Sequence, residues 1–341
     1  MSAGKGVVEK LAGGGTLDRA EARALMERLT SGAEEKEAIK SLLLALNTRT
    51  RTVDELAGLA EGMRARAVPL KITREPLIDT CGTGGDGLQT FNISTAAALV
   101  AAGAGAAVAK HGNRSVSSKS GSADVLESLG VRIDAPPGEA RRSIEETGFG
   151  FLFAPVFHPA MRHVAPARRE LGVRTVFNLL GPLCNPARVR RQVVGLYDAD
   201  LLETYARVLL RLGAQRVLVV HGEDGMDEMS LAAPTRVCFA DASDGLRLET
   251  VTPEDAGLTR CAAEDLRGGD AAENARLMEG VLEGRPGPLL EATLYNAGAA
   301  LTAAGMSRSI KEGTAAARDS VRAGKARDVL DALRARAGDA A

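Results

Sequence analysis

The chain has 341 residues, 45% hydrophobic and 26% charged, a balance typical of a folded globular protein and a length that suggests more than one domain. Its 43 basic and 44 acidic side chains give a formal net charge of −1, so no overall positive field attracts nucleic acid or an anionic membrane. The sequence also contains no run of about 18 uncharged apolar residues. We therefore predict neither a nucleic-acid partner nor a membrane span.

Glycine is over-represented, whereas the residue types that bind zinc are scattered. The 38 glycines exceed the roughly 24 expected from average usage. The four cysteines lie far apart, and His158 and His163 are five residues apart, which is poor spacing for one helical face. We therefore expect free thiols and no zinc site. The first 15 residues lack the apolar core of a secretory signal, which favours a cytoplasmic location.

Residues 1–72 are predicted to form a small helical domain. Apolar side chains recur at helical spacing in three stretches, within residues 18–29, 34–46 and 52–63. Asp18 with Glu21, and Thr52 with Glu55, have the spacing of capping boxes at the starts of the first and third stretches. We expect helices from about 160–188 to join this domain, and an apolar face to be left for another chain.

Residues 73–341 show an alternating pattern that indicates a larger α/β domain. Short apolar runs predict strands, separated by helical segments, at residues 77–78, 106–109, 149–154, 193–197 and 217–220. The last two runs flank a helical segment that ends at Gly213, which makes a βαβ unit. Repeated units of this kind predict a mainly parallel central sheet. In such a sheet ligands bind beyond the carboxyl ends of the strands, where three unusual sequences follow.

The first of these sequences is the glycine-rich loop DTCGTGGD at 79–86, followed by NIST at 92–95 and a helix of small apolar residues. Glycines allow positive φ and a close approach of backbone N–H groups, and a helix N-terminus behind them suits phosphate. The stretch 82–87 also satisfies G-x-G-x-x-G. However, the helix starts late and the next strand ends in Lys110 rather than in an acid, which disfavours a nicotinamide cofactor. A loop whose glycines only turn the chain is the other interpretation.

Two further strand ends add cations and carboxylates. KHGNRSVSSKSGSAD at 110–124 combines cations, an amide and hydroxyls, as expected of a polyanion-binding loop or, alternatively, of an ordinary solvated loop. HGEDGMDEMS at 221–230 contains the adjacent carboxylates Asp227 and Glu228, hard oxygen ligands suited to Mg²⁺. Adjacent acids are common on surfaces, so their position decides the interpretation. We expect these loops on neighbouring strand ends, forming a diphosphate–magnesium site.

These motifs, together with FHPAMRHVAPARRELGVRTVFNLLGPLCNP at 157–186, resemble those of the anthranilate phosphoribosyltransferase family. The likeness covers nearly the whole chain, including LDRAEARALMERLTSG at 17–32 and VDELAGLAEGMRARA at 53–67. It implies a nucleoside phosphorylase-like phosphoribosyltransferase fold and a homodimer formed through the helical domain. It also implies transfer of the 5-phosphoribosyl group from phosphoribosyl pyrophosphate (PRPP) to the amino group of anthranilate in tryptophan biosynthesis. Any anthranilate synthase partner would be a separate chain.

The same resemblance assigns roles to particular residues. Those that would bind PRPP are Gly82, Gly85, Asp86, Thr90, Asn92, Ile93, Ser94, Thr95, Lys110, His111, Gly112, Asn113, Arg114, Ser115, Val116, Ser117, Ser118 and Ser122. Those that would contact anthranilate are Gly82, Asn113 and Arg168. Magnesium, at two ions per subunit, would be held by Ser94, Asp227 and Glu228. The resemblance implies no discrete catalytic acid or base.

The chemistry of such a reaction agrees with this residue set. The departing pyrophosphate needs N–H donors, cations and Mg²⁺, and the uncharged aniline nitrogen needs no strong base. Arg168 could grip the anthranilate carboxylate with two hydrogen bonds, although a surface arginine beside Arg169 is the other interpretation. A pyrimidine nucleoside phosphorylase shares the fold, but the Asp227–Glu228 pair and the KHGNR loop disfavour it. A non-catalytic nucleic-acid-binding relative would need a basic surface or stacking aromatics.

Overall fold

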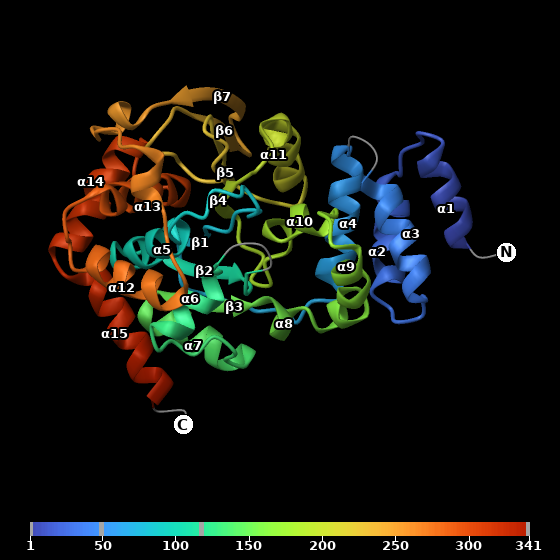
Figure 1. Cartoon of the computed structure of the whole chain (residues 1–341), viewed down its shortest axis with the longest axis horizontal. Helices are drawn as coiled ribbons and strands as arrows, with labels where there is room; N and C mark the ends of the chain where they lie inside the picture. The colour runs from blue at the N-terminus through green and yellow to red at the C-terminus, as the bar shows by residue number, and fades with distance from the viewer. Residues whose placement is uncertain (1–2, 48–50, 116–118, 339–341) are drawn as a thin grey trace.

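The computed structural model describes residues 3–47, 51–115 and 119–338. A group of helices lies at the N-terminal end of the molecule, a sheet lies at its centre, and the C-terminal helices lie at the other end (Figure 1). The predicted architecture, a small helical part followed by a larger α/β part, is confirmed. The predicted site residues Val116, Ser117 and Ser118 fall outside the described residues. Within the described ranges, no helix is both long enough and apolar enough to cross a bilayer.

The helical part contains four helices where the sequence predicted three. They are α1 (Ala3–Ala12), α2 (Arg19–Leu29), α3 (Lys36–Asn47) and α4 (Val53–Ala65). Both predicted capping boxes form, because the Asp18 carboxylate accepts from the Glu21 N–H at 2.8 Å and the Thr52 hydroxyl from the Glu55 N–H at 3.2 Å. The first helix was missed because glycines at 4 and 6 weaken its helical pattern.

One seven-stranded sheet forms the centre, in the order β3-β2-β1-β4-β5-β6-β7. Its strands are β1 (Leu77–Asp79), β2 (Ala107–Gly112), β3 (Phe149–Phe153), β4 (Arg191–Gly195), β5 (Arg216–Gly222), β6 (Thr235–Asp241) and β7 (Gly245–Val251). From β3 to β5 every neighbouring pair is parallel, whereas β6 and β7 are antiparallel additions at one edge. The mainly parallel sheet is therefore confirmed, and its antiparallel edge was not predicted. The predicted βαβ unit is β4, α11 (Leu202–Arg211) and β5.

The strand order corrects one expectation. The glycine loop follows β1 and the carboxylate pair follows β5, but β4 lies between these two strands. The two sequences are therefore not on neighbouring strand ends, and the loop after β5 must pass over the end of β4 to reach the loop after β1. The chain permits this crossing at Gly195, the last residue of β4, where an added Cβ would lie 1.6 Å from the Asp227 carbonyl oxygen.

Further helices cover the sheet. Those between the strands are α5 (Ile93–Gly103), α6 (Ser122–Ser128), α7 (Pro137–Thr147), α8 (Ala154–Phe157), α9 (Ala165–Leu171) and α10 (Phe177–Leu180). Those at the C-terminal end are α12 (Ala271–Leu282), α13 (Pro288–Ala304), α14 (Ile310–Arg322) and α15 (Lys325–Gly338). The last of these helices agrees with the Ala- and Arg-rich terminal helix indicated by the sequence.

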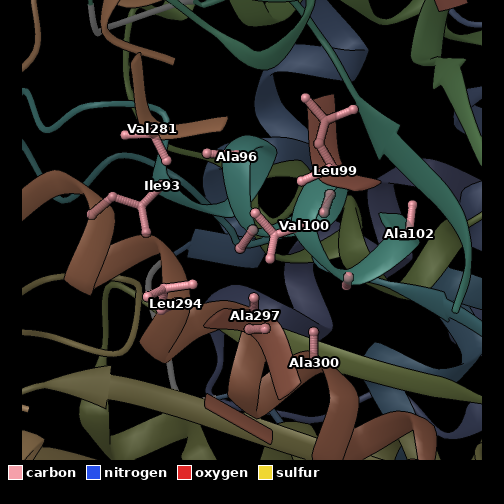
Figure 2. Packing of buried hydrophobic residues seen from close by; sticks show 14 of the residues in the cluster. Ile93, Ala96, Leu99, Val100, Ala102, Val281, Leu294, Ala297 and Ala300 are labelled. Carbon is pink, nitrogen blue, oxygen red and sulfur yellow. The ribbon is translucent and has the colours of Figure 1, made fainter. Parts of the chain in front are cut away.

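Alternate residues of the central strands belong to two different cores. Leu218 and Val220 of β5 face a core built around α5 and α13, where small side chains let the two helices approach closely (Figure 2). Val217 and Val219 face a second core that contains α11, residues of α2–α4 and the segment Val164 to Cys184. The helical part joins this core through α11, α10 and α9, against which α4 and α3 pack.

Candidate active site

A cavity of about 610 Å³ lies at the carboxyl ends of the parallel strands. Its walls come from the glycine loop, the end of β2, the segment from Ala154 to Pro182, and the loop after β5. Every predicted site residue within the described ranges lines it: Gly82, Gly85, Asp86, Thr90, Asn92, Ile93, Ser94, Thr95, Lys110, His111, Gly112, Asn113, Arg114, Ser115, Ser122, Arg168, Asp227 and Glu228. A second cavity of about 840 Å³, between the β6–β7 edge and the α13–α14 connection, contains none of them.

The glycine loop is tied to the end of β4. The Thr83 N–H donates to the Gly195 carbonyl at 2.9 Å, and the Thr83 hydroxyl accepts from the Tyr197 N–H at 3.2 Å. Gly84 and Gly85 adopt φ of +64° and +80°, as expected for this loop, but Gly82 does not adopt positive φ. Gly82 is needed for space instead, because an added Cβ would lie 2.8 Å from the Asp227 carboxylate. The loop therefore presents backbone N–H groups toward the cavity floor.

Asp227 and Glu228 form that floor together with the N-terminus of α5. Asp227 Oδ2 accepts from the Gly84 N–H at 2.6 Å, and Glu228 Oε1 accepts from the Ser94 N–H at 3.1 Å. Burial raises the pKa of Asp227 well above its usual value, and repulsion from Glu228 and Asp86 raises it further. Burial likewise raises the pKa of Glu228, to about 7, against the attraction of Lys110. A bound cation would offset this repulsion and stabilise the ionised carboxylates.

The donor set fits magnesium better than zinc. Among the described residues, no three His, Cys, Asp or Glu side chains converge in a way that could hold a metal ion. Two carboxylates and the Ser94 hydroxyl supply hard oxygen ligands but leave half of an octahedral shell open. Water and the oxygens of a bound diphosphate are the usual ligands that complete such a shell around Mg²⁺. All four cysteines are free, as expected, and none belongs to a zinc-type cluster.

The sequence predicted that Lys110 begins a loop, but in the structure it belongs to strand β2. The strand β2 continues to Gly112, and Lys110 is buried, with Nζ donating to the carbonyl and hydroxyl of Thr80 at 3.1 and 3.2 Å. Beneath it, Asp79 is fully buried and accepts from Asn185 Nδ2 at 2.7 Å. Burial raises the pKa of Asp79 to about 6, against the attraction of Lys110. The lysine is thus a fixed positive charge in the cavity wall.

Other predicted PRPP residues are held by neighbouring residues outside the predicted set. Arg114 pairs with Glu127 at 2.7 Å and with Asp124 at 3.0 Å, and these partners raise its pKa. Asp124 also accepts from the Ser115 and Gly121 N–H groups at 3.0 and 2.9 Å. The Asn92 amide donates to the Ser120 carbonyl at 3.1 Å and so connects the first two loops. Arg114 therefore faces α6 and orders its own loop.

The opposite wall of the cavity contains buried, uncharged histidines. The rings of His111 and His158 are 5.1 Å apart, and His111 Nδ1 lies 3.0 Å from the Gly181 carbonyl oxygen. If Nδ1 donates to that carbonyl, Nε2 is a free acceptor, and within the described chain it has no hydrogen-bond partner. Burial lowers the pKa of His111 to about 3 and that of His158 to about 4. Both rings are therefore neutral at pH 7.

Arg168 joins this wall from α9. Its guanidinium lies over the Phe177 ring, 5.1 Å from the centroid, and burial lowers its pKa while leaving it cationic. Arg168 lines the cavity, whereas Arg169 is exposed on the surface, and a carboxylate-binding role for Arg168 stays a prediction. Sequence reasoning did not single out the other lining residues of this wall: His158, Met161, Ala165, Phe177 and Asn178. These residues lie within the segment 157–186, which carries part of the family resemblance but whose residue types alone indicate no particular chemistry.

Comparisons with known proteins agree with this geometry. The family described as "Glycosyl transferase family, a/b domain" matches residues 74–327, and "Glycosyl transferase family, helical bundle domain" matches residues 5–67. The fold and the cavity thus define the chain as a glycosyltransferase. Its relatives include an anthranilate phosphoribosyltransferase of Symbiobacterium thermophilum, 50% identical over 331 residues that cover 97% of this chain and 96% of the relative.

Solved structures narrow the class further. A crystal structure of anthranilate phosphoribosyltransferase from Thermus thermophilus has a TM-score of 0.91 and 49% identity, covering 96% of this chain and 98% of that one. The enzyme from Saccharomyces cerevisiae, in complex with PRPP and Mg, also has a TM-score of 0.91, at 26% identity and 98% coverage of both chains. The chain belongs to the anthranilate phosphoribosyltransferase family.

Proposed function

We propose that the protein transfers the 5-phosphoribosyl group from PRPP to the amino group of anthranilate, giving N-(5-phosphoribosyl)anthranilate and pyrophosphate. One observation carries the proposal. A single cavity has a glycine loop and a carboxylate pair on one side, and a partly buried arginine with neutral histidines on the other. The first side suits a diphosphate with its cation, and the second suits an aromatic carboxylate with an uncharged amine. Membership of the family supports both assignments.

In the proposed reaction the donor side stabilises the leaving group. Glycine-loop N–H groups other than those of Thr83 and Gly84 would donate to the pyrophosphate oxygens, and Lys110 would add a positive charge nearby. Asp227, Glu228 and Ser94 would hold magnesium, which when bound neutralises the charge that develops on the pyrophosphate. The raised pKa values of the two carboxylates support a cation at this position.

The acceptor side would orient the nucleophile without deprotonating it. Arg168 would take the anthranilate carboxylate, and Gly82 and Asn113 would line the space between the two substrates. The amine of anthranilate is already neutral at pH 7, so its lone pair is available for attack on the ribose C1. The neutral His111 ring places no positive charge in this part of the cavity. We propose, as the resemblance implies, that no discrete catalytic acid or base is needed.

We further propose the finer features implied by the family resemblance. These are two magnesium ions per subunit, a cytoplasmic location, a role in tryptophan biosynthesis beside a separate anthranilate synthase, and a division into domains 1–72 and 73–341 with 160–188 joined to the first. We also propose a homodimer through the helical part, as the family resemblance implies. Light scattering on the purified protein would test the dimer.

The experiment that tests the activity follows the intrinsic fluorescence of anthranilate. Loss of fluorescence is expected only when enzyme, PRPP and Mg²⁺ are all present, and addition of a chelator should stop it. Inorganic phosphate with a pyrimidine nucleoside tests the phosphorylase alternative, and a fluorescent oligonucleotide tests the nucleic-acid-binding alternative. No loss of anthranilate fluorescence, together with turnover or binding in either alternative assay, would overturn the proposal.

A further inference from the structure

A buried asparagine on α13 clamps the backbone of the loop that carries the carboxylate pair. Asn296 Nδ2 donates to the Met229 carbonyl at 2.9 Å and to the Ala292 carbonyl at 3.0 Å. Asn296 Oδ1 accepts from the Met229 N–H at 2.9 Å. Both amide hydrogens are used, and a flipped amide would place its oxygen against two carbonyls, so these contacts fix the orientation of the side chain.

The clamped residue directly follows Glu228. Glu228 is itself held from the other direction, because its Oε1 accepts from the Ser94 N–H at the start of α5. The segment from Glu228 to Met229 is therefore fixed by two different helices, α5 and α13. A shift of either helix would move the carboxylate relative to the rest of the cavity.

The two helices pack closely against each other. Val100 of α5 lies near Ala297 of α13 in the core, with Leu294 beside Ile93 (Figure 2). Such fully buried side chains leave no room for one helix to slide along the other. The positions of the Ser94 N–H and the Asn296 amide are thus set by one rigid contact.

Other contacts of the loop hold it to neighbouring residues of its own segment. The Ser230 hydroxyl donates to Asp224 Oδ2 at 2.6 Å, and the Ser230 N–H donates to the Thr235 hydroxyl at 3.0 Å. These bonds shape the loop but do not fix it to the helices. Asn296 provides that attachment at the residue next to Glu228.

We propose that Asn296 is a positioning residue for the cation site. It holds the Met229 backbone and so aims the Glu228 carboxylate at the point where a divalent cation would bind, without touching the cation or either substrate. The inference rests on the proposed function, since it takes Asp227 and Glu228 to be the cation ligands.

The test measures cation binding directly, with Mn²⁺ as a paramagnetic probe in the presence of PRPP. Asn296→Leu removes all three hydrogen bonds at a similar volume, and Asn296→Ala is the second variant. We expect Mn²⁺ to bind about 10-fold or more weakly in these variants, in the range seen when an outer-shell partner is lost. The KM for anthranilate at saturating Mg²⁺ and PRPP should stay unchanged, which a general loss of structure would not produce.

The matched control is Thr293→Val on the same helix. Thr293 is fully buried, and its hydroxyl donates to the Leu289 carbonyl at 2.7 Å, with no bond to the loop. This variant should lower the melting temperature but leave Mn²⁺ affinity unchanged. Wild-type Mn²⁺ affinity in the Asn296 variants, or an equal loss in Thr293→Val, would overturn the inference.

The same titration separates the inference from the proposed function. Asp227→Asn with Glu228→Gln should abolish Mn²⁺ binding at this site. If that double variant binds Mn²⁺ as the wild type does, the proposed metal pair is wrong. If it loses Mn²⁺ while both Asn296 variants retain wild-type affinity, only the positioning role is wrong.

Discussion

The cavity has two parts, called here the donor wall (the glycine loop, Asp227 and Glu228) and the acceptor wall (His111, His158 and Arg168). Burial has opposite effects on the ionisable groups of these two walls. On the donor wall, burial raises the pKa of Asp227 and Glu228, which means that it destabilises their ionised forms. A bound cation would stabilise those forms. On the acceptor side, burial lowers the pKa of His111 and His158, so the rings stay neutral. The difference matches the two ligands, a polyanion with its metal and an uncharged amine. We propose that this difference lets one site receive both substrates.

The largest expected effect tests the donor wall alone. Asp227→Asn with Glu228→Gln should lower kcat/KM about 1,000-fold, because the metal contributes several kcal/mol of charge stabilisation to the transition state. Steady-state fluorescence assays would measure this, with Glu223→Gln, an exposed carboxylate in the same loop, as the control. An unchanged kcat/KM in the double variant would contradict the metal assignment.

The next prediction tests how the donor wall is assembled across β4. Gly195→Ala places a Cβ where the Asp227 carbonyl oxygen lies, 1.6 Å away, so the loop must move. We expect a loss of about 1–3 kcal/mol in the free energy of unfolding and a clear fall in kcat, because overpacking displaces the backbone. Urea denaturation and kinetics would measure both. Gly138→Ala, where an added Cβ meets nothing within 4 Å, is the control. A wild-type kcat in Gly195→Ala would show that the close approach of the Asp227 backbone to Gly195 is not needed to position the carboxylates.

The acceptor wall is tested by Arg168→Ala. The variant should raise the KM for anthranilate by roughly 10- to 100-fold, the value of a charge-assisted hydrogen-bond pair, and should change the KM for PRPP little. Arg169→Ala, next in sequence but exposed, should change neither constant. Equal increases in the KM for anthranilate and the KM for PRPP would mean that Arg168 does not bind anthranilate selectively.

The smallest effect concerns stability and tests the neutrality of the histidines. The folded-state pKa of His158 is about 4, against about 6.5 in the unfolded chain. As pH falls from 7 toward 5, the unfolded chain binds a proton that the folded chain does not, so the free energy of unfolding should fall by about 1–2 kcal/mol for this group. His158→Gln should reduce that slope in urea denaturation at the two pH values. Groups common to both proteins, such as Asp79, cancel in the comparison, and identical slopes would show that His158 is not buried neutral.

The donor wall was predictable because its chemistry is local. The glycine loop, the α5 N-terminus and the Asp227–Glu228 pair each follow a strand in sequence, and parallel strands bring such ends to one edge. Two features escaped prediction there. Periodicity identifies strands but not their order, so the position of β4 between β1 and β5 was missed. The extension of β2 through Lys110 was also missed, since a lysine does not mark a strand.

The acceptor wall could not be derived from local patterns. His158 and Phe177 belong to the segment 157–186, which carries part of the family resemblance but no residue pattern that indicates a chemistry, and their place in the cavity depends on how that segment packs. Arg168 and Arg169 are equivalent in sequence, and only packing on α9 separates them. The same is true of Asn296, which lies 67 residues along the chain from the Met229 backbone that it holds. Such residues depend on tertiary contacts that one sequence does not reveal.

The most direct test of the division between the two walls is a crystal structure with PRPP, Mn²⁺ and anthranilate. We expect an anomalous manganese signal within coordination distance of Asp227 and Glu228, with the pyrophosphate along the glycine loop and the anthranilate carboxylate at Arg168. Manganese bound away from both carboxylates, or anthranilate bound on the side of the glycine loop, would contradict the division.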